Sequence, residues 1–201
     1  ATEDARFYSH TGVDAKGLTR AILLLGRAGG GSTITQQLAK QLWSPRANNI
    51  FERALQKPIE WVIATKLERL YSKEEILTMY LNQFDFLYNA VGVKSAAQVY
   101  FSTTPADLKI EEAATLVGLC KNPALYNPIR RPERALARRN TVLGQMCKYD
   151  YITPEVCDSL QALPIEIKYQ SVDHKQGLAP YFREYLRGVL TAKQPKASNY
   201  P

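Results

Sequence analysis

The chain lacks long apolar runs, paired cysteines and internal repeats. No run approaches the roughly 20 apolar residues that a membrane-spanning helix needs, and no signal-peptide pattern is present. The three cysteines, Cys120, Cys147 and Cys157, give neither a disulfide framework nor a close metal-ligand spacing. These absences argue against a repeat protein, a disulfide-stapled scaffold and a cysteine-based metal module. Cys120 lies in an apolar helical run, so we expect it in the core.

The best-known phosphate signatures are also missing. No Lys-Ser or Lys-Thr follows the glycines of the Gly29–Lys40 stretch, as a P-loop requires, and no apolar β-branched strand precedes them, as a dinucleotide-binding fingerprint requires. The chain has no interleaved basic and aromatic residues of the kind that stack on nucleic-acid bases. We therefore expect no nucleic-acid partner.

What the chain does have is one substantial core and a basic surface. Its 201 residues are 45% hydrophobic, enough for one sizeable core with a smaller appended lobe. The 26 Lys and Arg against 19 Asp and Glu leave a formal charge of +7, which favours an anionic partner such as a membrane surface or a polyphosphate. A merely soluble basic surface is the simpler alternative.

Apolar spacing predicts a mainly α fold. Helices are expected over residues 14–27, 32–43, 49–71, 73–81, 95–100, 111–119, 130–149, from Thr153 onward, and 180–190. Ser72 and Glu75 form a capping box, and Pro58 should bend the third helix or begin a new one. Only Ile165, Ile167 and Tyr169 alternate as in a strand.

The Gly29–Lys40 stretch is the feature around which the chain is organised. Its glycines predict a flexible loop that leads into a helix, with Ser32 or Thr33 as the N-cap. A helix start attracts anions, and Gln36, Gln37 and Lys40 are placed to join it around a phosphate or a sugar. A plain surface loop with a good cap is the alternative.

Two further groups carry charge suited to chemistry. Glu3 lies in an acidic segment that runs to His10, and Arg53, Lys57 and Glu60 share one helical face. Glycosyl transfer needs carboxyl groups on opposite sides of the reacting sugar, which Glu3 and Glu60 can supply. A phosphate leaving group needs cations, which Lys40, Arg53 and Lys57 can supply. A charged helix start and a solvated salt-bridge ladder are the simpler interpretations.

Taken together, these segments resemble the peptidoglycan glycosyltransferase domain, glycosyltransferase family 51, of class A penicillin-binding proteins and their monofunctional relatives. The matching segments follow one another in order along the chain. They are Glu3-Asp4-x-x-Phe7-x-x-His10-x-Gly12, Gly30-Gly31-Ser32-Thr33-Ile34-Thr35-Gln36-Gln37-Leu38-Ala39-Lys40, Lys57-x-x-Glu60, Tyr71-Ser72-Lys73-x-x-Ile76-Leu77-x-x-Tyr80-Leu81-Asn82 and Pro123-x-x-Tyr126-Asn127-Pro128.

The resemblance implies a lysozyme-like, mainly α fold, with a head lobe and a smaller, membrane-proximal jaw lobe at roughly residues 12–29 and their neighbours. The glycosyltransferase domain would occupy residues 1–175, and residues 176–201 would be a linker toward a transpeptidase domain. The chain would act at the extracytoplasmic, periplasmic face of the cytoplasmic membrane. Because its first residues open directly into a motif, we expect a membrane anchor to precede them.

The resemblance also implies the reaction, which joins lipid II disaccharides into β-1,4-linked glycan with inversion and releases undecaprenyl pyrophosphate. Glu3 would be the general base, supported by Asp4, Phe7 and His10. Glu60 would assist departure of the pyrophosphate, directly or through a divalent cation such as Mg²⁺ or Mn²⁺, without an organic cofactor. The donor site would be formed by Ser32, Thr33, Gln36, Gln37 and Lys40, with Arg53 or Lys57 near the pyrophosphate.

The implied partners are lipid II, the growing lipid-linked glycan, the membrane surface and cell-wall synthesis proteins. Three residues depart from the common family pattern: Gln56 stands where an Arg is usual, Pro58 separates Lys57 from Glu60, and Thr78 stands where a Glu is common. A lysozyme-like glycan hydrolase or lytic transglycosylase is the rival interpretation, and a non-catalytic anion-binding module is a third.

Overall fold

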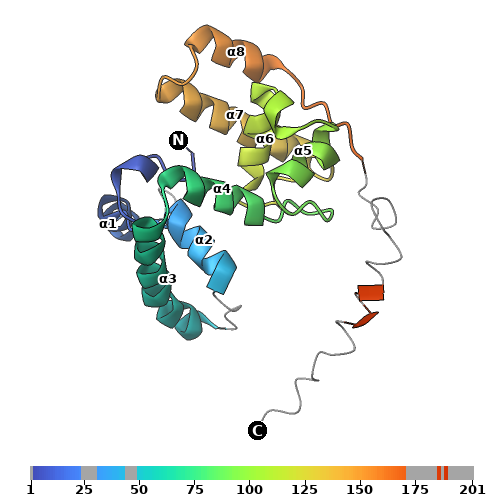
Figure 1. The fold of residues 1–201 in the computed structure, drawn as a ribbon. Coiled ribbons are helices and arrows are strands. Elements are labelled where there is room, and N and C mark those ends of the chain that lie inside the picture. The colour runs from blue at the N-terminus through green and yellow to red at the C-terminus, as the bar shows by residue number, and fades with distance from the viewer. Residues whose placement is uncertain (1, 24–30, 44–48, 171–184, 187, 190–201) are drawn as a thin grey trace. The chain divides into compact units, whose positions relative to one another are not determined.

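The structure is a computed structural model that describes residues 2–23, 31–43, 49–170, 185–186 and 188–189 (Figure 1). Residues 171–201 form one compact unit, and residues 1–170 form the other. The elements of this unit are η1 (Phe7–Ser9), α1 (Ala15–Leu23), α2 (Ile34–Trp43), α3 (Ile50–Leu70), α4 (Lys73–Gln83), α5 (Val93–Phe101), η2 (Pro105–Asp107), α6 (Ile110–Leu119), α7 (Pro132–Lys148) and α8 (Pro154–Ala162).

The predicted mainly α fold is confirmed. Within the described residues the one β-type pairing is an isolated bridge between Asp85 and Val91. None of the helices in the described ranges is long and apolar enough to cross a membrane. Most of the predicted linker and of the expected helix at 180–190 lies outside the described residues.

The predicted capping box at the start of α4 is confirmed. The Ser72 hydroxyl accepts a hydrogen bond from the Glu75 amide at 3.2 Å, and the Glu75 carboxylate accepts one from the Ser72 amide at 2.8 Å. Asn49 caps α3 by accepting from the Glu52 amide at 2.8 Å. Of the two alternatives expected at Pro58, a bend or a new helix, the new helix is wrong, because α3 runs through Pro58 as one helix of 21 residues.

The predicted strand at Ile165–Tyr169 is also absent. The segment is extended, but its amides bond to a helix end instead of a neighbouring strand: Lys168 donates to the Tyr100 carbonyl and Gln170 to the Val99 carbonyl, both at 2.9 Å. Carbonyls in the last turn of a helix have no partner within the helix, so they are free to accept. The apolar residues alternate in this segment because one side of it faces the core, against which Ile167 packs.

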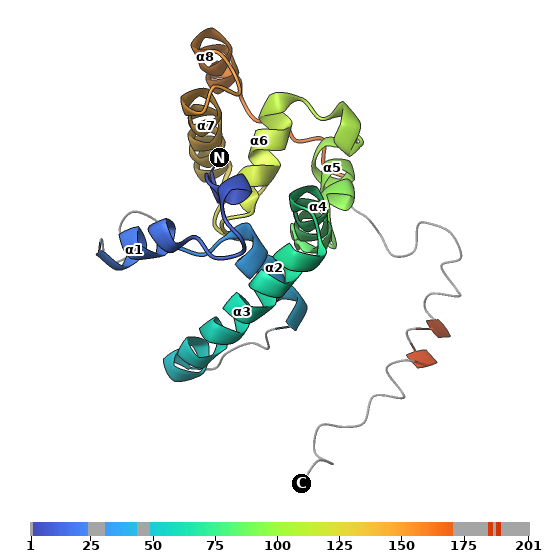
Figure 2. The same cartoon turned by 60° about the vertical axis from the view of Figure 1, so that its left-hand side comes forward.

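The helices pack in two groups joined by α5 (Figures 1 and 2). Helices α2, α3 and α4 pack together, and α6, α7 and α8 form the second group. The main core lies between them and includes Leu38, Tyr80, Phe86, Tyr100 and Cys120. The core position predicted for Cys120 is confirmed, and burial raises the pKa of its thiol to about 12.

Candidate active site

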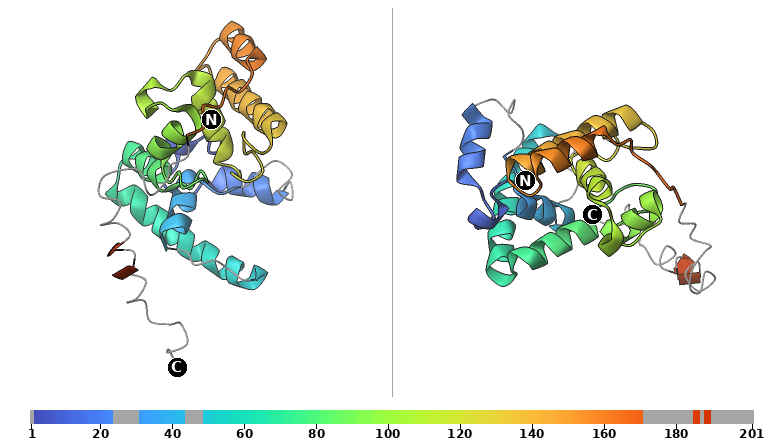
Figure 3. Two further views of the ribbon diagram at one scale, coloured as in Figure 1. Left: turned by 90° about the vertical axis from the view of Figure 1, so that its right-hand side faces the viewer. Right: turned by 90° about the horizontal axis from the view of Figure 1, so that it is seen from above.

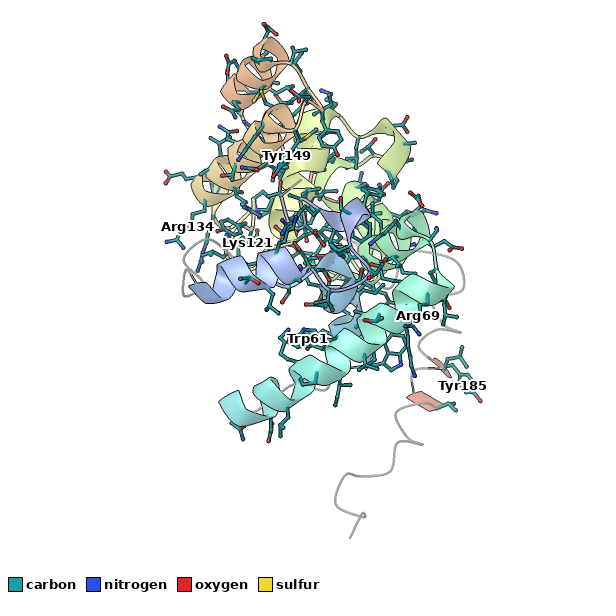
Figure 4. All side chains as sticks on the ribbon, turned by 90° about the vertical axis from the view of Figure 1, so that its left-hand side faces the viewer. Trp61, Arg69, Lys121, Arg134, Tyr149 and Tyr185 are labelled. Carbon is teal, nitrogen blue, oxygen red and sulfur yellow. The ribbon has the colours of Figure 1, made fainter. Side chains whose placement is uncertain are left out.

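A cleft of about 820 Å³ opens between the two helix groups. One wall is formed by residues 2–6, the start of α2 and the middle of α3. The other is formed by Cys120 and Lys121, which follow α6, and by α7 with Tyr149 after it. Figure 4 labels Lys121 and Tyr149, which line the second wall. The cleft brings together most of the predicted site residues, namely Glu3, Asp4, Ser32, Thr33, Gln36, Gln37, Lys40, Lys57 and Glu60.

Two of the remaining predicted residues, Phe7 and His10, are not part of the cleft lining. Phe7 is buried in the core, where the Lys73 ammonium lies 4.5 Å from its ring centroid. His10 lies behind Asp4, as described below. Arg53 belongs to α3, but its side chain is outside the described part of the structure.

Glu3 forms an ion pair that was not predicted from the sequence. Its Oε1 accepts a hydrogen bond of 2.6 Å from Nη2 of Arg138, and the Arg138 guanidinium also lies 5.6 Å from the Tyr126 ring. Both charged side chains are largely buried. The pair compensates the Glu3 charge and orients the carboxylate at the cleft surface.

A sequence signal for Arg138 does exist. The buried stripe of α7 consists of Ala135, Arg138, Arg139, Val142 and Leu143. Two arginines at the apolar positions of an amphipathic helix are unusual, because a buried charge needs a partner. Their position on the buried stripe therefore indicates that Arg138 and Arg139 each have polar partners inside the protein.

The Asp4 carboxylate lies at the N-terminus of α2. Its Oδ2 accepts a hydrogen bond of 3.1 Å from the Ile34 amide and lies 3.0 Å from Nε2 of His10. The His10 carbonyl in turn accepts from Nζ of Lys73 at 2.6 Å. The anion expected at this helix start is therefore partly supplied by the chain itself, and Asp4 fixes the segment that carries Glu3.

Thr33, of the two candidates, is the N-cap of α2. Its hydroxyl accepts from the Gln36 amide at 3.2 Å and donates to the Gly12 carbonyl at 2.6 Å. Gly12 has a φ of 89°, and a Cβ at this position would lie 2.9 Å from the Ala64 backbone. Only glycine therefore allows the chain to approach α3 this closely at residue 12. Ser32 lines the cleft just before the cap.

The two glutamines are held by the protein. Nε2 of Gln36 donates to the Gly12 carbonyl at 3.3 Å, and Oε1 of Gln37 accepts from the Tyr80 hydroxyl at 3.1 Å. Burial, together with the nearby Cys120 and Glu3, raises the pKa of Tyr80, so its hydroxyl stays a donor. These contacts fix the orientation of the glutamines in the cleft wall.

Glu60 and Lys57 form the second charged pair, on α3. Nζ of Lys57 lies 2.5 Å from Oε2 of Glu60. Glu60 is only 2% exposed, which rules out a solvated salt-bridge ladder for this pair. Lys40 is exposed at the cleft lining, so a second ammonium is available to an anionic ligand.

Arg6 and Asp14 form a further pair at the cleft. The guanidinium donates three hydrogen bonds of 2.6–3.1 Å to the carboxylate, which also accepts from the Gly17 amide at 3.1 Å. Burial opposes ionisation of Asp14 most strongly, but the bonds from Arg6 and Gly17 together outweigh it and lower its pKa. Asp14 thereby caps α1 and ties it to the Glu3 segment.

Comparison with known proteins places this chain in a family. The transglycosylase family matches residues 1–147. Penicillin-binding protein 1A of Aquifex aeolicus is 42% identical over 198 residues, which are 96% of this chain and 26% of that protein. Penicillin-binding protein 1A of Escherichia coli is 43% identical over 193 residues, or 93% of this chain and 22% of that protein.

A crystal structure of penicillin-binding protein 1A from Haemophilus influenzae is also similar, with 26% identity and a TM-score of 0.49 over 83% of this chain and 21% of that one. The chain thus spans about a quarter of the length of the curated relatives given above. The family match and the identities to the Aquifex aeolicus and Escherichia coli proteins show that the chain belongs to the transglycosylase family, as a peptidoglycan glycosyltransferase domain of the class A penicillin-binding protein type.

Proposed function

We propose that this domain polymerises lipid II into β-1,4-linked glycan and releases undecaprenyl pyrophosphate, at the extracytoplasmic face of the cytoplasmic membrane. One observation carries the proposal: two carboxylates, Glu3 and Glu60, line a single cleft, and each is paired with its own cation. Inverting transfer needs a base for the acceptor and charge stabilisation for the leaving group, and the two pairs suit these two tasks.

Glu3 would act as the general base. A sugar hydroxyl is a poor nucleophile at neutral pH, and a positioned carboxylate speeds such a step by on the order of 100- to 10,000-fold. Arg138 holds Oε1, which leaves Oε2 to take the hydroxyl proton as the new glycosidic bond forms. The bond between the donor carbon and the pyrophosphate oxygen breaks in the same step.

Lys57 and Lys40 would bind the departing pyrophosphate, with Ser32 and the start of α2 beside them. Glu60 keeps the Lys57 ammonium fixed through their 2.5 Å contact. A divalent cation, Mg²⁺ or Mn²⁺, bound by Glu60 and the pyrophosphate would add charge neutralisation. No group of three or more acidic, His or Cys side chains suits a metal within the described residues, so such an ion would take most ligands from the substrate.

An apolar stripe on α3 supports a membrane surface as partner. Leu55, Ile59 and Val62 are 74%, 58% and 59% exposed and recur at helical spacing, and Trp43 of the adjacent α2 is 55% exposed. Figure 3 shows α3 extending beyond the neighbouring helices. A lipid-linked substrate is reached at a bilayer surface, where such a stripe can be buried.

The discriminating experiment offers the chain lipid II or finished peptidoglycan. A polymerase gives long glycan and free undecaprenyl pyrophosphate from lipid II, and it releases nothing from finished glycan. Release of sugar from finished peptidoglycan without lipid II would instead establish the hydrolase. The polymerase is favoured because the family match covers the donor-site stretch Gly30–Lys40, which a hydrolase does not need.

A further inference from the structure

The thiols of Cys147 and Cys157 meet in a small apolar cluster, and neither cysteine is part of the cleft lining. Cys157 is 4% exposed and belongs to the cluster with Ala114, Val142 and Leu143, and Cys147 packs against it while partly exposed. The two side chains are hydrogen-bonding partners of each other. They come from α7 and α8, which lie side by side (Figure 2).

Hydrogen bonds at both ends of the helix pair hold α7 and α8 in place around these thiols. At the turn, the Asp150 amide donates to the Cys147 carbonyl at 3.0 Å, and Asp150 itself has a φ of 59°. At the far end, Nε2 of Gln161 donates to the Asn140 carbonyl at 3.0 Å. Held in this way, α7 and α8 keep the two sulfur atoms together.

We propose that Cys147 and Cys157 form a disulfide that clamps α7 to α8 and leaves the chemistry of the cleft unchanged. The bond would form by exchange with a small-molecule disulfide such as oxidised glutathione. The Cys147 thiolate attacks it and releases one glutathione thiol; the Cys157 thiolate then attacks the Cys147 sulfur and releases the second. Two protein thiols are oxidised and one glutathione disulfide is reduced to two thiols.

The order of attack follows from burial. Cys147 is partly exposed, so an external disulfide can reach it, whereas Cys157 is covered. Burial, helped by the adjacent Cys147 and Asp158, raises the pKa of Cys157, so little of it is thiolate at neutral pH. Its attack is nevertheless intramolecular, because the target sulfur is already its contact partner.

The oxidant supply and the comparison of polymerisation rates rest on the proposed function. The extracytoplasmic side of a membrane is an oxidising environment in which disulfides persist. The geometry of the two thiols does not depend on the substrate of the cleft. Thiol linkage can therefore fail or succeed independently of any polymerisation assay.

The test treats the whole chain with oxidised glutathione and maps its tryptic peptides. Cleavage after Lys148 separates the two cysteines, so the disulfide appears as peptide 140–148 linked to peptide 149–168. The linked protein should melt roughly 5–10 °C above the reduced one. Cys147→Ser and Cys157→Ser should each abolish the linked pair, whereas Cys120→Ser should retain it.

Several outcomes would overturn the proposal. Three unmodified thiols after oxidation, or glutathione adducts that never resolve, would show that the sulfurs cannot bond. A linkage to Cys120, or a linked form that melts no higher than the reduced form, would disprove the clamp. Polymerisation of lipid II should stay within about twofold between the oxidised and reduced chains, and a complete loss on oxidation would contradict a cleft left unchanged.

Discussion

Arg138 donates a 2.6 Å hydrogen bond to Glu3 across 135 positions of the sequence. The pair joins the segment before α1 to α7 and so connects the two walls of the cleft. Since α7 also packs on α6 and α8, the orientation of Glu3, the proposed base, depends on the group formed by α6, α7 and α8. Changes in the packing of α6, α7 and α8 should therefore alter the position of the Glu3 carboxylate in the cleft.

Replacing Glu3 with Gln should remove catalysis and keep the fold. The amide oxygen can still accept from Arg138, so the unfolding free energy should change by only about 1 kcal/mol. The amide cannot take a proton, so lipid II polymerisation should fall on the order of 100- to 10,000-fold. Glycan length on gels and a thermal melt measure the two effects. Wild-type polymerisation rates in the folded variant would remove Glu3 from the mechanism.

The neighbouring arginines of α7 should behave differently when each is replaced by Met. Arg138→Met leaves Glu3 without its cation, so we expect a fall in kcat of on the order of 100-fold, comparable to the loss of one oriented donor at other catalytic sites. Arg138→Lys should retain part of the kcat that Arg138→Met loses, because an ammonium supplies the positive charge without the guanidinium geometry. Steady-state kinetics with lipid II give the comparison.

Arg139→Met is the matched control, because Arg139 is completely buried and bonds to carbonyls of Gln161, Leu163 and Pro164. Its loss removes the guanidinium donor from the Leu163 and Pro164 carbonyls, whereas the Gln161 carbonyl still accepts from the Asn140 side chain, so the free energy of unfolding should fall by about 2 kcal/mol or more. Catalysis by the folded fraction should be nearly unchanged. Equal losses of kcat in the two variants would mean that Arg138 acts only through the stability of α7.

Local chemistry made part of this architecture predictable from the sequence. Ser72 and Glu75 are three residues apart, and Thr33 precedes an apolar stripe, so both caps depend only on near neighbours. The donor-site stretch and the two glutamates were likewise predicted from short motifs, and the cleft contains both. Their catalytic roles remain predictions.

Contacts between distant segments were not predictable in the same way. The pairing of Glu3 with Arg138 requires knowing that α7 crosses the start of the chain. The extended segment 165–169 alternates like a strand, yet its partner is the end of α5, which periodicity cannot reveal. At Pro58, the sequence predicted a bend or a new helix, and helical residues on both sides maintain one continuous α3.

Removing the Lys73 ammonium should destabilise the fold beneath the site. Nζ of Lys73 lies 2.7 Å from Oε2 of Glu68, which is 5% exposed, and Oε1 of Glu68 accepts from the Thr35 hydroxyl at 2.5 Å. Lys73→Met leaves a buried, unpaired carboxylate, at a cost of about 3–5 kcal/mol. Urea unfolding measures the change.

A double-mutant cycle with Glu68→Gln separates the energy of the Lys73–Glu68 ion pair from the other contributions of Lys73 to stability. In the double variant the carboxylate is gone, so much of the loss from Lys73→Met should be recovered. Additive losses from the two substitutions would show that the ion pair contributes nothing and that the contact of Lys73 with the His10 carbonyl dominates.

Acid sensitivity should depend in part on Asp14. Because the folded pKa of Asp14 is lowered, its ion pair with Arg6 stabilises the fold above the unfolded carboxyl pKa of about 4, and this stabilisation is lost as the pH falls through the folded pKa. Arg6 is partly exposed, so the contribution at neutral pH should be only about 1 kcal/mol or less.

Asp14→Asn keeps an oxygen for the Gly17 amide but lacks the titrating group. Its unfolding free energy should therefore lie below that of the wild type at pH 7, and the difference should narrow as the pH falls from about 4 towards 2. Urea unfolding of both proteins across this range tests the sign. Exposed Asp107→Asn, whose carboxylate bonds only a local hydroxyl among the contacts described, serves as the control. A gap between wild type and Asp14→Asn that widens on acidification would contradict a lowered pKa.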